Sequence, residues 1–171
     1  MTKTDRQLIQ QAVIFGFGLP NGIIAALLTW FAVKGTTQLE LTSTMFSELP
    51  MVAFLTAFIL PFFAPLNLKG VLSKSPNMMM TQSKDQHPYA KFIPLNIILG
   101  PLMIAMVTAF IFAVIPLLVV WLIKLQLFIS PIFWIAFKVI YTTAVAIFAG
   151  YLGCIWALYR YVADGKISIN A

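Results

Sequence analysis

The stretch PIFWIAFKVIYTT, residues Pro131 to Thr143, is an apolar run that contains one lysine, Lys138. The run continues to Tyr159 and is closed by Arg160. A run of this length is typical of a helix that crosses a bilayer, for which about 20 apolar residues are enough. Lys138 is then an ionisable side chain inside a membrane span, and its role depends on where the other apolar runs lie.

The composition of the whole chain agrees with a membrane protein. Of its 171 residues, 61% are hydrophobic and 9% are charged, and the mean hydropathy is +0.94. A soluble domain carries about a quarter charged residues, so this chain has apolar surface that must face lipid. The net charge of +6 does not indicate nucleic acid, because the eleven basic residues are spread between apolar blocks and are not gathered on one face.

Four apolar runs are long enough to span a bilayer. They cover residues 12–33, 49–68, 97–123 and 128–159. The sequence therefore predicts an all-α integral membrane protein with four transmembrane helices. The first run follows a basic head but no clear cleavage site, so we expect a retained span and not a signal peptide.

We divide the chain into two tandem two-span hairpins. Residues 1–72 form the first, residues 73–91 a cytoplasmic loop, and residues 92–171 the second hairpin with a short tail. Lysine and arginine set the orientation because they are enriched in cytoplasmic segments. One side carries eight of them and the other two: Lys3, Arg6, Lys69, Lys74, Lys84, Lys91, Arg160 and Lys166 against Lys34 and Lys124. Both termini and the middle loop are predicted to be cytoplasmic, and we place the chain in a bacterial inner membrane.

The position of Lys138 follows from its distance to Arg160. The 22 residues between them correspond to about 33 Å of helix, which is close to the hydrocarbon thickness. Lys138 is therefore expected near the outer boundary. Two interpretations are open: an anchor whose stem carries the ammonium to the headgroups, or a cation that lines a cavity together with Tyr141 and Thr142.

Asn21 is the strongly polar residue that lies deepest in a predicted span. Pro20 beside it has no N–H to donate to the carbonyl of Gly16, and Gly18 and Gly22 let another backbone approach closely. An unpaired carbonyl and an amide at this depth need partners, in neighbouring helices or in water. The pattern fits a kinked, tightly packed helix, and it also fits a broken-helix ligand site.

Prolines interrupt other predicted spans near the cytoplasmic side. The predicted helix breaks are Pro20, Pro61, Pro65 and Pro101. The tripeptide PLN occurs at 65–67 and again at 94–96, at the facing inner ends of consecutive spans. Its asparagines, Asn96 among them, either line an inward-facing vestibule or bond free backbone groups where helices end.

Small residues recur at every fourth position of the last span, at Thr142, Ala146, Gly150 and Cys154. Rows of this kind permit close contact between helices. We therefore expect a packing face there. Its partner is either a helix of the same chain or a second copy.

The two halves of the chain show signs of a duplication. A shift of 81 residues aligns Pro20 with Pro101, and FAV at 31–33 with FAV at 112–114. Residues 46–72, FSELPMVAFLTAFILPFFAPLNLKGVL, resemble the second half of an uncharacterised bacterial two-span membrane domain that occurs in tandem. The second half of this chain departs from that pattern, because its last span lacks the Pro-Leu-Asn-x-Lys ending. The resemblance implies architecture and brings no activity with it.

The acidic residues are expected outside the spans, at Asp5, Glu40, Glu48, Asp85 and Asp164. His87 and Cys154 are the single histidine and the single cysteine, so no metal site and no internal disulfide are expected. Membrane enzymes and proton-coupled exporters of cationic drugs use carboxylates or histidines at membrane depth. We therefore expect neither catalysis nor a cofactor.

Two functional hypotheses remain for a chain surrounded by lipid. The first is a homodimeric carrier or channel for a neutral or anionic small solute. Its ligand or pathway residues would be Asn21, Gly22, Asn96, Lys138 and Tyr141. The second is a non-catalytic accessory subunit that packs against a larger membrane protein.

Overall fold

The computed structural model describes residues 3–72, 92–123 and 128–163, which are almost entirely helical. The whole predicted middle loop, residues 73–91 with His87, and the predicted turn at 124–127 lie outside the described residues.

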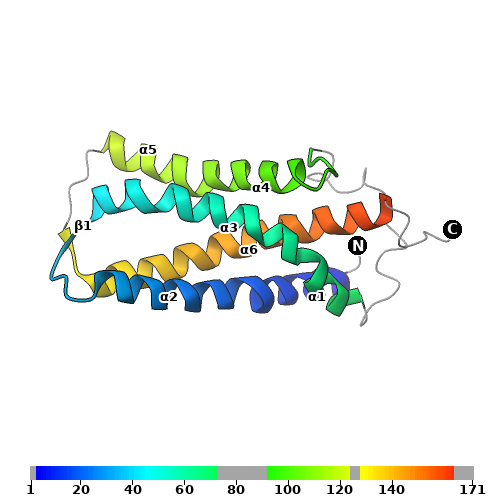
Figure 1. Ribbon diagram of the computed structural model, residues 1–171, viewed down its shortest axis with the longest axis horizontal. Helices are drawn as coiled ribbons and strands as arrows, with labels where there is room; N and C mark the ends of the chain where they lie inside the picture. Colours follow the sequence, from blue (N-terminus) through cyan, green and yellow to red (C-terminus); the bar gives the residue numbers. More distant parts are fainter. Residues whose placement is uncertain (1–2, 73–91, 124–127, 164–171) are drawn as a thin grey trace.

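Four helical rods run side by side (Figure 1). The first consists of α1 (Lys3–Val13), the π-helix η1 (Ile14–Gly18) and α2 (Leu19–Val33). The second is α3 (Leu41–Leu72). The third consists of α4 (Leu99–Ala109), the π-helix η4 (Phe110–Val114) and α5 (Ile115–Leu122), and the fourth is α6 (Pro131–Ala163).

Each rod contains a segment long and apolar enough to cross a membrane, which confirms the predicted set of four apolar helices. These segments are Ile9–Val33, Leu41–Leu68, Leu99–Leu122 and Pro131–Arg160. The second begins eight residues before the predicted start at Leu49. Hydroxyl groups explain this early start, because Thr44 donates to the carbonyl of Glu40 at 2.7 Å and Ser47 donates to that of Thr44 at 3.0 Å. Polar side chains that bond back to the preceding turn are compatible with a helix.

The two ends of the bundle differ in their connections. At the end that we call the strand end, β1 (Leu39–Glu40) pairs antiparallel with β2 (Phe128–Ile129). Phe128 was predicted to begin the last span, but it belongs to this strand, and the helix begins at Pro131. At the opposite end, the terminal end, α1 begins and α6 ends (Figure 1). The predicted orientation places the terminal end in the cytoplasm.

Helices α3 and α6 pack against each other along the middle of the bundle (Figure 1). The rod of α1 and α2 lies on one side of this pair and the rod of α4 and α5 on the other. Helix α2 packs on α6, and α4 packs on α3. The most extensive helix interface therefore joins the two predicted hairpins to each other.

Two clusters of buried side chains fill the bundle. The strand-end cluster joins four helices and includes Val33, Leu49, Leu117, Trp134 and Tyr141. The terminal cluster lies in the other half of the bundle and includes Ile9, Phe17, Leu68, Ile104 and Trp156. These clusters hold α3 and α6 together along their whole shared length.

A π-turn accommodates Pro20 without breaking the first rod. The N–H of Leu19 donates to the carbonyl of Ile14, five residues back, and Pro20 follows in the first turn of α2. A turn of this kind shifts the hydrogen-bond register at the point where a proline cannot donate. The third rod repeats the arrangement, because η4 directly precedes Ile115 and Pro116.

The other predicted helix breaks, at Pro61, Pro65 and Pro101, each lie within a helix. Helix α3 continues through Pro61 and Pro65 to Leu72. Pro101 lies in the first turn of α4, where a missing N–H leaves no intrahelical bond unmade. Pro101 therefore has a different local setting from Pro20, with which the 81-residue shift aligns it.

Candidate functional site

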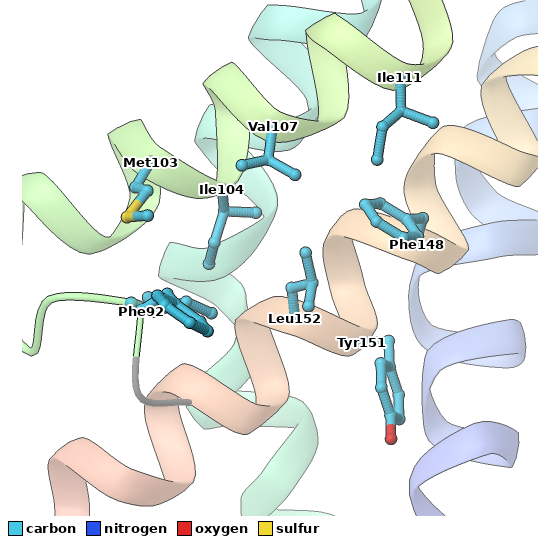
Figure 2. Close-up of a pocket in the computed structure, with 9 residues that line it drawn as sticks. Phe92, Met103, Ile104, Val107, Ile111, Phe148, Tyr151 and Leu152 are labelled. Carbon is cyan, nitrogen blue, oxygen red and sulfur yellow. The ribbon is translucent and has the colours of Figure 1, made fainter. Parts of the chain in front are cut away.

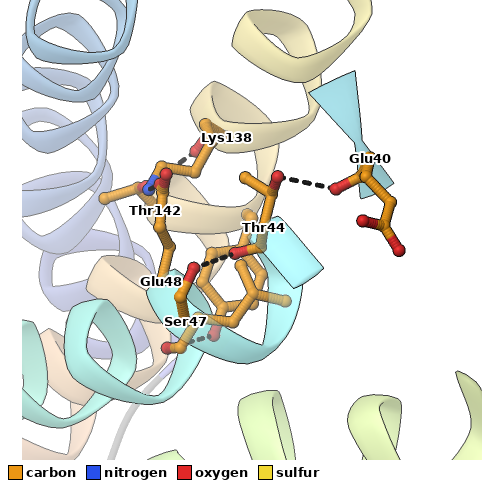
Figure 3. Close-up of polar contacts among 8 residues, drawn as sticks. Glu40, Thr44, Ser47, Glu48, Lys138 and Thr142 are labelled. Atoms are coloured by element: carbon orange, nitrogen blue, oxygen red, sulfur yellow. Dashed lines mark hydrogen bonds and ion pairs between the residues drawn. The ribbon is translucent and has the colours of Figure 1, made fainter. Parts of the chain in front are cut away.

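The candidate site is an ion pair between Lys138 on α6 and Glu48 on α3, near the strand end (Figure 3). The side chain of Lys138 is 8% exposed, whereas that of Glu48 is 37% exposed. The prediction that all acidic residues lie outside the spans is wrong for Glu48. Because α3 begins at Leu41, Glu48 lies inside the apolar segment Leu41–Leu68.

The partner of Lys138 bears on its two interpretations. Its ammonium reaches across to the carboxylate on the neighbouring helix, and the residue as a whole is buried. An anchor would instead hold its ammonium out at the surface. Lys138 is thus a buried, paired cation, and its pairing cross-links α3 to α6.

Aromatic rings accompany the ion pair along α6. The Lys138 nitrogen lies 5.6 Å from the ring centroid of Trp134, within the range of a cation–π interaction. Trp134 stacks on Phe137 at 5.4 Å between centroids, and Phe137 stacks on Tyr141 at 5.8 Å. Trp134 is fully buried, and its Nε1 has no acceptor within the described part of the chain. The indole N–H of Trp134 is therefore a buried donor that makes no hydrogen bond to the described residues.

Tyr141 and Thr142 lie beside Lys138, as the sequence predicts, but both hydroxyls are used by backbone. The Tyr141 hydroxyl donates to the carbonyl of Leu49 at 3.1 Å. Since Leu49 directly follows Glu48, this bond fixes the turn of α3 that carries the carboxylate. The Thr142 hydroxyl donates to the carbonyl of Lys138 at 2.7 Å, within its own helix.

Asn21 and Gly22 serve the packing of the first rod. The Nδ2 of Asn21 donates to the carbonyl of Phe17 at 2.8 Å, at the end of the π-turn. Gly22 is buried against α6, where an added Cβ would lie 2.5 Å from the Oγ1 of Thr143. This geometry matches the kinked, tightly packed helix among the two interpretations of this region.

Asn96 has a structural role at the start of α4. Its Oδ1 accepts the N–H groups of Ile98 at 2.9 Å and of Leu99 at 3.2 Å. These are backbone donors without a partner inside the helix, so Asn96 acts as a capping residue. Of the two predicted roles for the asparagines, Asn96 has the one at a helix end.

The row of small residues on α6 packs inside the chain. Thr142, Ala146, Gly150 and Cys154 are all buried. An added Cβ at Gly150 would lie 2.5 Å from the ring of Phe17, and one at Gly153, in the adjacent row, would lie 3.0 Å from the Cα of Pro61. The partners are helices of the same chain, so this row offers no free face to a second copy.

Two apolar grooves flank α6 in the terminal half of the bundle. The α4 groove, of about 680 Å³, lies between α6 and the rod of α4, and Met103, Val107 and Ile111 line its far wall (Figure 2). The α1 groove, of about 700 Å³, lies between α6 and the first rod, with Gln10, Val13, Ile14 and Ala144 in its lining. Phe148 and Tyr151 line both grooves. The five predicted pathway residues line neither.

The charged groups of the site are the ammonium of Lys138 and the carboxylate of Glu48. Within the described ranges, no group of three His, Cys, Asp or Glu residues is placed to hold a metal ion. Cys154 is 1% exposed and belongs to the packing row.

Comparisons with protein-family models, with curated proteins and with solved structures found no match to this chain. The family resemblance of residues 46–72 and the tandem duplication therefore stay predictions.

Glu48 is the site residue that the sequence analysis missed, because the second span was placed after it. The buried residues Met45, Leu49, Ala53 and Ala57 recur at a four-residue spacing on α3. This helical spacing continues across the predicted span boundary. It was the signal that could have extended the helix and taken Glu48 into it.

Proposed function

We propose that this chain is a non-catalytic, multi-pass carrier of small anionic solutes in a bacterial cytoplasmic membrane, with both termini in the cytoplasm. The observation that carries the proposal is the pairing of Lys138 with Glu48 inside two apolar helical segments. Charged side chains inside apolar segments are rare, and those that pair with one another commonly mark the path of an ion or substrate. The solute class follows from the more deeply buried partner, which is the cation.

Glu48 occupies the place of the solute when the site is empty. Because Lys138 is 8% exposed, removing its counter-charge without a replacement is strongly unfavourable. Glu48 is 37% exposed, so its carboxylate has room to leave while an incoming anion takes its place. The charge of Lys138 then stays balanced throughout the exchange.

The surroundings of Lys138 favour an oxyanion over a cation or an uncharged solute. A carboxylate or phosphate group accepts short, strong hydrogen bonds from an ammonium. A cationic solute would instead be repelled by Lys138.

The experiment measures uptake of radiolabelled phosphate, lactate and succinate into liposomes that contain the purified protein. We expect uptake of at least one of these anions, and a fall of tenfold or more in Lys138→Gln. Lys34→Gln is the matched control, because Lys34 is an exposed cation at the same end, 5.5 Å from the ring of Trp30. Absence of uptake for all three anions, or equal uptake by Lys138→Gln, would contradict the proposal.

A second candidate is the accessory subunit. It is favoured by the terminal cluster, whose apolar side chains fill the bundle between Tyr141 and the terminal end. A carrier must open this cluster during transport, whereas an accessory subunit does not. Native mass spectrometry of the gently extracted protein separates the two, since a larger membrane protein in fixed stoichiometry supports the accessory role. A homodimer would need a face other than the small-residue row.

A further inference from the structure

An aromatic ridge divides the two grooves beside α6. The ridge consists of Phe148 and Tyr151, which line the α4 groove on one side and the α1 groove on the other. In Figure 2, Phe148 faces Ile111 of the third rod, while Tyr151 points toward the first rod. The α4 groove and the α1 groove, of about 680 and 700 Å³, therefore lie next to each other and share a wall.

The walls of both grooves are shorter than one membrane leaflet is deep. The wall from Met103 to Ile111 corresponds to about 12 Å of helix, and the wall from Ala144 to Tyr151 to about 10 Å. Half of the hydrocarbon core is about 15 Å thick. One turn beyond Ala144, toward the strand end, Ile140 is 71% exposed. A transmembrane helix of a partner would need contact along both leaflets, whereas an acyl chain occupies one.

The described helices carry more basic than acidic residues at the terminal end, where Lys3, Asp5, Arg6, Lys69 and Arg160 lie. Lys3 and Arg6 belong to α1, which borders one groove, and Arg160 lies at the end of α6, which borders both. Gln10 adds a polar side chain to the lining of the α1 groove. Basic residues at a cytoplasmic membrane surface attract anionic lipid headgroups.

We propose that the two grooves bind one anionic diacyl lipid, with one acyl chain on each side of the aromatic ridge and the headgroup at the terminal end. Apolar pockets of about 300 to 1,000 Å³ with few polar groups are typical of sites for small ligands. The lipid site shares no residue with the Lys138 site. Its presence or absence is therefore independent of the proposed transport.

The first experiment is native mass spectrometry of the protein released from nanodiscs that contain equal amounts of phosphatidylglycerol and phosphatidylcholine. We expect one retained phosphatidylglycerol per chain. Ala144→Phe fills the α1 groove and Val107→Phe fills the α4 groove, and each should lower the retained fraction at least tenfold. Ile140→Phe and Val114→Phe are the controls, because these residues are 71% and 50% exposed outside the grooves and should retain the lipid.

The second experiment uses the unmodified chain, so its result does not depend on the folding of a variant. A phosphatidylglycerol with a diazirine in its acyl chain is photo-crosslinked to the protein, and the modified peptides are identified. We expect labels on residues 103–111 and on residues 144–152. Labels spread evenly over other exposed apolar residues, such as Ile23 and Leu28 on α2, would overturn the proposal.

Two further results of the mass spectrometry would also contradict the proposed lipid site. Equal retention of phosphatidylcholine would overturn the assignment of an anionic headgroup. A lipid-free dimer that is abolished by Ala144→Phe would replace the lipid with a second copy of the chain.

Discussion

A buried apolar cluster joins α3 to α6 at both the strand end and the terminal end of the bundle, but the further contacts between the two helices differ. At the strand end, directional polar contacts join α6 to α3: the pair of Lys138 with Glu48, and the bond from Tyr141 to the carbonyl of Leu49. At the terminal end, the two helices fit by shape, with Gly153 against the backbone of Pro61.

This contrast bears on the proposed function. A carboxylate that leaves an ammonium can be replaced by another anion, so under that proposal the ion pair at the strand end has an alternative partner. Close packing has no such alternative, because an interface of small and apolar residues loses contacts when it opens.

Unpairing the buried lysine should have the largest effect. Glu48→Gln leaves the ammonium of Lys138 without its carboxylate, and we expect the free energy of unfolding to fall by about 3 kcal/mol. Lys138→Gln should cost clearly less, since the carboxylate that it leaves is 37% exposed and can be hydrated. Unfolding by SDS in mixed micelles, followed by circular dichroism, measures both.

The double variant Glu48→Gln/Lys138→Gln sharpens this test. It should be more stable than Glu48→Gln alone, because no uncompensated charge remains in the bundle. Equal losses in the two single variants would contradict the unequal burial of the two partners.

The close approach of α3 and α6 at the terminal end comes next. Gly153→Leu would push a side chain against the backbone of Pro61, because even an added Cβ at this position would lie 3.0 Å from the Cα of Pro61. We expect a loss of about 2 kcal/mol, typical of overpacking. Ala136→Leu, at an exposed position of the same helix, is the control and should change the stability little. Equal losses of stability in Gly153→Leu and Ala136→Leu would show that close packing does not hold α3 and α6 together at the terminal end.

The hydroxyl of Tyr141 should have a smaller effect. Tyr141→Phe removes the bond to the Leu49 carbonyl and is expected to cost about 1 kcal/mol in the same unfolding assay. Thr142→Val removes a bond within one helix and should cost less, because it does not join α6 to α3. A larger cost for Thr142→Val would argue that the strand end depends on the helix itself and not on contacts between helices.

The smallest effect is expected at Asn21. Its amide donates to the carbonyl of Phe17 in its own rod, so Asn21→Leu should cost about 0.5 kcal/mol, the lower end of the net contribution of a hydrogen bond. Anion uptake should stay within twofold of the unmodified protein. A tenfold fall in uptake without a change in stability would restore Asn21 as a ligand residue.

The sequence by itself determined the four apolar helices. In a bilayer, every backbone group must be paired within a helix, and a run of about 20 apolar residues is a local property that needs no neighbours to be recognised. The helix-end role of Asn96 and the burial of the small-residue row on α6 were likewise among the roles expected from local pattern, because capping and four-residue spacing act within one helix.

Only the tertiary structure decided which helices meet. Glu48 and Lys138 are 90 residues apart, and the first was placed outside the spans until α3 was found to begin at Leu41. The sequence likewise does not predict that Gly150 packs against Phe17 and Gly153 against Pro61. The local apolar pattern predicts that a helix face is buried, but it does not predict which helix covers that face. The partner depends on the shapes of side chains that come together from distant parts of the chain.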